Sequence, residues 1–137
     1  MKIHWVRIVV AGLVAELGLL VIYDLLIRLH LDSTVARLLV VIAGSFVFVL
    51  LGALWAARKS DAYFVLQGTL VGVAAVVVYI LMTLPMVLRG HYPMNYWLAA
   101  LVGHPPKLLG GVAGGFLAGR RLNAKKSIAQ KAAKSAT

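Results

Sequence analysis

Residues 5–27 read WVRIVVAGLVAELGLLVIYDLLI, an apolar run that only Arg7, Glu16 and Asp24 interrupt with charge. At about 1.5 Å per residue, a helix of this length spans the roughly 30 Å hydrocarbon core of a bilayer. The run is too long for the apolar part of a secretory signal and has no small-residue cleavage site behind it, so we expect an uncleaved first helix. Further apolar runs at 35–57 and 62–88 predict a second and a third span.

The composition excludes an ordinary soluble protein. Of the 137 residues, 62% are apolar and 13% are charged, whereas soluble proteins are about half apolar and a quarter charged. The net charge of +10 is typical of nucleic-acid binding, but the basic residues gather at the ends of the apolar runs. Anionic membrane lipids are therefore the expected partner, and binding to nucleic acid is not expected. The absence of cysteine excludes disulfides and thiolate chemistry.

The stretch after residue 90 allows two interpretations, because Pro93 and the pair Pro105-Pro106 interrupt it. In the first, a short interfacial helix at 94–103 precedes a fourth span at 106–122, and Lys107 lies near the interface, where its stem can snorkel. In the second, one long kinked helix at 96–119 buries Lys107. The first is favoured, because a lysine deep in lipid is costly.

The predicted fold is therefore all-α. Residues 1–122 form a bundle of four transmembrane helices with a short interfacial helix before the fourth span, and residues 123–137 form a basic cytoplasmic tail.

The distribution of basic residues predicts the orientation. The N-terminus, the turn after the second run and the tail together carry ten of the 14 Lys and Arg, and the opposite side carries four, Lys107 among them. The positive-inside rule then places both termini in the cytoplasm of a bacterial-type inner membrane. The tail is expected to bind the anionic inner leaflet through six basic residues, Arg120, Arg121, Lys125, Lys126, Lys131 and Lys134.

Small residues recur at four-residue spacing, which lets membrane helices approach closely. Two interleaved rows lie on the fourth span, and shorter rows lie on the second and third. The predicted packing residues are Gly52, Ala56, Gly68, Gly72, Gly110, Gly111, Gly114, Gly115 and Gly119. The fourth span is thus expected to be held on more than one side, at the bundle centre or in a dimer contact. The alternative is that glycine is simply common in membrane helices.

Glu16 is the residue most suggestive of function, because it lies near the centre of the first span, where a charged carboxylate costs at least about 2.5 kcal/mol. No Lys or Arg is expected at its depth, so the carboxyl is predicted to be protonated, or to face a wet cavity or a bound cation. It is either a proton- or cation-coupling group or a structural carboxyl that a neighbouring helix binds, through Gln67, Thr69 or a backbone carbonyl. Asp24 is expected to pair with Arg28, four residues later.

No metal, cofactor or enzymatic activity is expected. His30, His91 and His104 fall on the predicted outer side, so a metal or haem site there is a distant third hypothesis, although no pair has the spacing of a recognised site. No catalytic triad, phosphate loop or paired catalytic acids appear.

Two resemblances to known families accompany this pattern. The segments 52–59, 67–72 and 110–121 resemble small bacterial four-helix inner-membrane proteins of unknown function, whose Gly-rich helices end in Ala-Arg-Lys or Gly-Arg-Arg. That resemblance implies no activity. Ala15-Glu16 is similar to small multidrug resistance transporters, four-helix dimers whose first-helix glutamate binds protons and cationic drugs. Only Glu16 carries over, since this chain is longer, has a proline-broken region and lacks the aromatic-glycine pattern of their third helix.

Two functions follow from the sequence. The first is a packing or partner-binding subunit without chemistry of its own, in a homo-oligomer or with another membrane protein. The second is a dimeric proton-coupled transporter or channel that uses Glu16. An oligomer is expected for that role, because four helices alone enclose little room for a permeation path.

Overall fold

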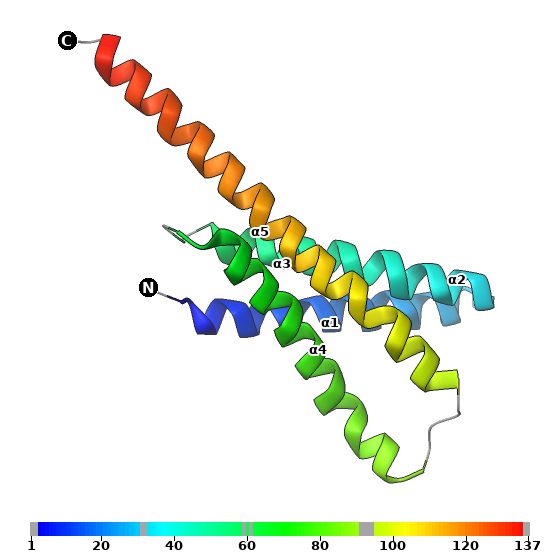
Figure 1. Cartoon of the computed structure of the whole chain (residues 1–137). Coiled ribbons are helices and arrows are strands. Elements are labelled where there is room, and N and C mark those ends of the chain that lie inside the picture. Colours follow the sequence, from blue (N-terminus) through cyan, green and yellow to red (C-terminus); the bar gives the residue numbers. More distant parts are fainter. Residues whose placement is uncertain (1–2, 31–32, 59, 61, 91–94, 136–137) are drawn as a thin grey trace.

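The computed structural model describes residues 3–30, 33–58, 60, 62–90 and 95–135, and its regular structure within them is helical. The elements are α1 (Trp5–Arg28), α2 (Thr34–Leu39), the π-helical turn η1 (Val40–Gly44), α3 (Ser45–Ala57), α4 (Phe64–Leu88) and α5 (Asn95–Ser135) (Figure 1). Since α2, η1 and α3 follow one another without a gap, they form one continuous helix over the second predicted span. The all-α prediction is confirmed for the described residues.

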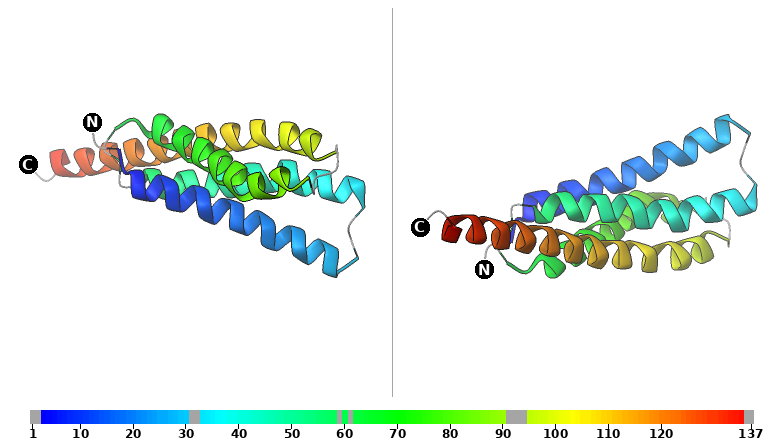
Figure 2. Two further views of the ribbon diagram at one scale, coloured as in Figure 1. Left: turned by 90° about the horizontal axis from the view of Figure 1, so that it is seen from below. Right: turned by 90° about the horizontal axis from the view of Figure 1, so that it is seen from above.

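Successive helices run in alternating directions along the bundle. The N-terminus, the α3–α4 connection and the C-terminus lie at one end, and the other two connections lie at the opposite end (Figure 2). We call the first of these the terminal end. α3 and α4 contact each other, and both α1 and α5 pack against this central pair. The first and last helices therefore lie on opposite sides of α3 and α4.

Within the described residues, three helices are long and apolar enough to cross a membrane: Trp5–Arg28, Val35–Ala57 and Phe64–Leu88. Their large apolar side chains face outward in many places, with Val6, Val21 and Leu81 each exposed by more than 60%. A soluble protein rarely exposes so much apolar surface to water. In a membrane, lipid covers such a surface. α5 is longer but less apolar and does not meet the same criterion, so the fourth span stays a prediction.

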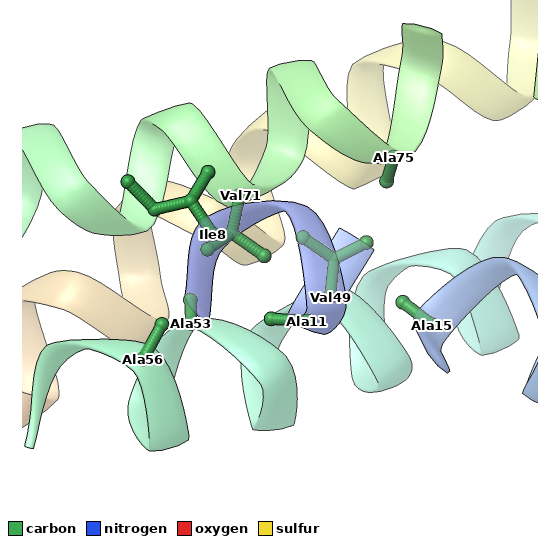
Figure 3. Packing of buried hydrophobic residues seen from close by; sticks show 8 residues of the cluster. All are labelled: Ile8, Ala11, Ala15, Val49, Ala53, Ala56, Val71 and Ala75. Atoms are coloured by element: carbon green, nitrogen blue, oxygen red, sulfur yellow. The ribbon is translucent and has the colours of Figure 1, made fainter. Parts of the chain in front are cut away.

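The apolar core consists mainly of small side chains (Figure 3). Alanines from α1, α3 and α4 meet there, and the only larger members are Ile8, Val49 and Val71. The buried residues of α1 lie within 8–16 and those of α4 within 67–75, the parts of these helices nearest the terminal end. Small side chains allow close approach of helix backbones, which is how membrane helices gain packing energy. The terminal half of the bundle is therefore the tightly packed half.

α5 corrects the prediction for the last third of the chain. One helix runs through Pro105 and Pro106 without a break, so the expected division into an interfacial helix and a span starting at 106 is wrong. Met94, the predicted first residue of that interfacial helix, lies outside the described residues. Proline removes a backbone N–H and normally ends or kinks a helix. Here α3 and α4 pack along the glycines that follow the prolines and hold the helix in one piece.

Two serines near helix starts have different roles. Ser33 caps the second helix, because its Oγ accepts a hydrogen bond from the backbone N–H of Ala36 at 3.2 Å. Ser60 does not cap α4, whose first residue is Phe64. Its hydroxyl instead donates to the carbonyl oxygen of Ala62 and accepts from Gln67 Nε2 at 2.8 Å.

The predicted pair at the end of α1 is formed. Arg28 Nε lies 2.6 Å from Asp24 Oδ2, and both side chains are more than half exposed. Exposed pairs of this kind contribute about 0.2 to 1 kcal/mol. Asp24→Asn is therefore expected to lower the free energy of unfolding by less than about 1 kcal/mol, measured by unfolding in mixed detergent micelles. A larger loss would mean that Asp24 has a buried role.

Candidate functional site

A buried ion pair joins the first and last helices. Lys107 Nζ of α5 lies 2.7 Å from Glu16 Oε1 of α1, and the two side chains are only 2% and 4% exposed. The expectation that no basic residue shares the depth of Glu16 is therefore wrong, as is the placement of Lys107 near the interface. Both expectations were wrong for the same reason: the favoured interpretation ended the interfacial helix before Lys107.

The position of Lys107 on α5 explains why it points inward. Lys107 precedes Gly111 by four residues, and Gly115 and Gly119 follow at the same spacing. Residues four apart lie on one face of a helix. The lysine therefore begins the glycine row that packs against α4. This spacing is the sequence signal that could have placed Lys107 inside the bundle.

Two glycines bring the three helices close enough for the pair to form. A Cβ at Gly72 of α4 would lie 2.7 Å from the carbonyl oxygen of Lys107, and a Cβ at Gly12 of α1 would lie 2.9 Å from the backbone nitrogen of Ala75. Real Cβ atoms do not come this close to backbone, so both positions require glycine. The space beside Gly12, one turn before Glu16, is thus filled by α4.

Two aromatic rings complete the surroundings of the lysine. Its Nζ lies 4.3 Å from the ring centroid of Tyr79, a cation–π distance. The His104 ring stands edge-on to Tyr79, with centroids 5.2 Å apart, and its buried Nδ1 has no hydrogen-bond partner among the described residues. We call Glu16, Tyr79, His104 and Lys107 the Glu16 cluster.

Tyr79 was not among the residues predicted from the sequence, and His104 was expected on the outer side. A signal existed for Tyr79, because it follows Gly68, Gly72 and Ala75 at spacings of four, three and four, which keeps all four on one face of α4. No comparable signal exists for His104, since its position depends on α5 continuing through the prolines.

The contacts of Glu16 distinguish the two roles predicted for it. A cavity of about 370 Å³ lies between α1 and α3, and Ala15 lines it but Glu16 does not. Gln67 and Thr69, the predicted neutral partners, donate hydrogen bonds to Ser60 Oγ and to the carbonyl oxygen of Val65. Lys107 is therefore the partner that the structure gives the carboxylate. The geometry links α1 to α5, two helices that otherwise pack on opposite sides of α3 and α4.

The two glycine rows of α5 face different neighbours. A Cβ at Gly110 or Gly114 would meet the carbonyl oxygens of Phe46 and Leu50 on α3, whereas Gly111 and Gly115 lie against the backbone of α4. The remaining predicted packing residues also lie between helices of the same chain: Gly52 beside Ala11, Ala56 fully buried, Gly68 and Gly72 against α5, and Gly119 against the ring of Phe64. α5 is thus held on two sides within one chain.

The predicted headgroup residues lie on the exposed end of α5. Arg120, Arg121, Lys125, Lys126, Lys131 and Lys134 are all exposed. The C-terminal part of α5 extends beyond the packed bundle (Figure 1).

The histidines do not form a common site in the described residues. His30 is exposed at the end of α1, His104 belongs to the Glu16 cluster, and His91 lies outside the described part. No group of three potential metal ligands comes together within that part of the chain.

Comparison with known proteins gives no match, either to a family model or to a curated protein or a solved structure.

Proposed function

We propose that the chain is a four-span protein of a bacterial-type inner membrane that acts as a partner-binding subunit without chemistry of its own. The observation that carries the proposal is the continuity of α5. This helix is fixed in the bundle by two glycine rows and by the pair between Lys107 and Glu16, and it then continues past the bundle. We call its final part, residues 123–135, the basic arm.

The ion pair supports α5 as the fourth span. A lone lysine near the middle of a span is costly, but Lys107 lies against the carboxylate of Glu16. In the folded bundle the two charges form a neutral pair, so the lower apolar content of α5 is no obstacle to spanning. Placing Lys107 inside the bundle also strengthens the charge asymmetry, because only Arg28, Arg37 and Arg89 remain for the outer side. Both termini are then cytoplasmic.

The orientation is testable with single cysteines, because the chain contains none. Leu29→Cys, at the exposed outer end of α1, is expected to react with a membrane-impermeant maleimide. The cells used have an opened outer membrane and an intact inner membrane. Ser127→Cys, in the basic arm, is expected to react at least tenfold less until the inner membrane is permeabilised. The two variants control for each other, and equal labelling of both in intact cells would contradict the topology.

The shape of the basic arm favours a protein partner over lipid headgroups. Thirteen helical residues extend about 20 Å at 1.5 Å per residue, whereas screening limits exposed charges to about 8 to 10 Å in physiological salt. Because the arm continues the axis of α5 (Figure 1), Arg120 and Arg121 lie nearest the membrane surface and Lys131 and Lys134 lie farthest from it. The outer lysines therefore suit an acidic protein surface.

Neutralising the arm is expected to weaken partner binding. With Lys125, Lys126, Lys131 and Lys134 changed to Gln, loss of four exposed pairs at about 0.5 kcal/mol each predicts about thirtyfold weaker binding. The measurement is the yield of protein cross-links from a photoreactive residue at Ile128, which is 69% exposed. The matched control, Arg120→Gln with Arg121→Gln, is expected to keep the yield. Cross-links to lipid alone, or loss only in the control, would favour the lipid-anchor role predicted from sequence.

A proton-coupled transporter is the second candidate, and the Glu16 cluster is the observation that favours it. A carboxylate, an ammonium group and an imidazole lie together deep in the bundle, and ionisable groups at such depth commonly mark transport pathways. The charge-neutral double variant Glu16→Gln/Lys107→Met separates the two functions. A subunit keeps its arm cross-links in that variant, whereas a transporter loses pH-dependent uptake in reconstituted vesicles.

A further inference from the structure

The cavity between α1 and α3 is an apolar groove on the outside of the bundle. Val10 and Val14 line it from α1, and Phe48, Leu51 and Trp55 line it from α3. Four of these five side chains are at least 40% exposed. The groove therefore opens onto the surface that faces the surrounding membrane.

The groove lies within the depth of one leaflet. Trp55 lies two residues before the end of α3, and Phe48 lies nine residues before it. At about 1.5 Å per residue these positions are about 3 Å and 14 Å from the helix end, and half of a hydrocarbon core is about 15 Å. The groove thus runs from the headgroup level at the terminal end to the middle of the membrane.

A positive charge stands at the headgroup end of the groove. The guanidinium carbon of Arg7 lies 5.4 Å from the ring centroid of Trp55. Arg7 precedes Val10 by three residues and Val14 by seven, so all three lie on one face of α1. The acidic side chains among the described residues, Glu16 and Asp24, pair with Lys107 and Arg28. Arg7 is therefore available to an external anion.

We propose that this groove binds an anionic phospholipid of the cytoplasmic leaflet, with one acyl chain along the groove and the headgroup phosphate on Arg7. The inference rests on the cytoplasmic position of the termini proposed above. The apolar lining selects an acyl chain, and the cation at the headgroup end selects a negative headgroup over a zwitterionic one. One basic residue near an anionic surface adds about 1 kcal/mol, which corresponds to about a fivefold preference.

Quenching of Trp55 fluorescence by brominated lipids tests the proposal. The double variant Trp5→Phe/Trp97→Phe keeps Trp55 as its sole tryptophan, and we call it the parent. The parent is reconstituted in phosphatidylcholine vesicles. Increasing fractions of lipid with brominated acyl chains are then added, as phosphatidylglycerol or as phosphatidylcholine. Half-maximal quenching is expected at about a fivefold lower fraction of the phosphatidylglycerol.

Three variants of the parent test where the preference arises. Arg7→Gln is expected to bring the two quenching curves together. Arg120→Gln is the matched control, because its guanidinium stacks on the Phe116 ring of α5 at 5.7 Å and is not part of the groove. It is expected to keep the fivefold difference. Val14→Phe, which fills the groove from an exposed position, is expected to reduce quenching by both lipids.

Coincident curves in the parent, or a preference that survives Arg7→Gln, would overturn the proposal. Weak quenching in the parent that increases as the protein is diluted in lipid would also overturn it. That result would mean that a second copy of the chain covers the groove at high protein concentration. Failure of the proposed orientation is recognised separately, since it changes the maleimide labelling of Leu29→Cys and Ser127→Cys.

Discussion

Glu16→Gln is expected to lower the free energy of unfolding by about 3 to 5 kcal/mol, the usual effect of removing one partner of a buried ion pair. The substitution preserves the size of the side chain but leaves the ammonium group of Lys107 buried without its counter-charge. Lys107→Met is expected to have a similar effect, because it leaves the carboxylate of Glu16 alone. The measurement is reversible unfolding in mixed detergent micelles, followed by circular dichroism.

The double variant Glu16→Gln/Lys107→Met provides the critical comparison. It removes both charges at once, so its stability is expected to return to within about 1 kcal/mol of the natural chain. Asp24→Asn is the matched control, since it breaks an exposed pair of the same chemistry. Single variants with effects as small as that control would show that water reaches the Glu16–Lys107 pair.

Gly111→Ala is expected to lower the free energy of unfolding by about 2 to 3 kcal/mol, near the upper end for one added methyl group in a packed site. The new Cβ would collide with the carbonyl oxygen of Gly68 and approach the backbone of Gly72. Backbone atoms cannot rotate away, so α4 and α5 must separate. The same unfolding measurement applies.

Gly44→Ala is the control for this prediction. Its Cβ would meet the tip of the Leu19 side chain, which can change rotamer, and no backbone atom of another helix is close. Because alanine favours a helix over glycine by up to about 1 kcal/mol, this variant is expected to be neutral or more stable. Equal losses at both glycines would mean that helix propensity, and not close contact of α4 with α5, controls the result.

The positions of the first three long helices could be predicted well from the length of the apolar runs in the sequence. The first run was expected at 5–27 and the second at 35–57, and the helices there are Trp5–Arg28 and Val35–Ala57. The third was expected from 62 and begins at Phe64. Apolar runs are local properties of the chain, and a bilayer of fixed thickness sets their length.

The structure of the last third of the chain was harder to predict, because it depends on contacts with segments that are distant in the sequence. Proline and a buried lysine each argue against one continuous helix when residues 95–135 are considered alone. Their effects are offset by other segments, namely the glycine contacts with α3 and α4 and the carboxylate of Glu16 on the first helix. The spacing of Lys107 from Gly111 did carry the information, but it becomes readable only if the helix is assumed to continue through Pro105 and Pro106.

The pairing of the first helix with the last has a consequence for biogenesis. A ribosome makes Glu16 long before Lys107, so α1 enters the membrane with an acidic group whose basic counterpart has not yet been synthesised. Until α5 arrives, that acid must hold a proton or stay in contact with water or the insertion machinery. Synthesis of α5 is then also the event that supplies the counter-charge of the first helix.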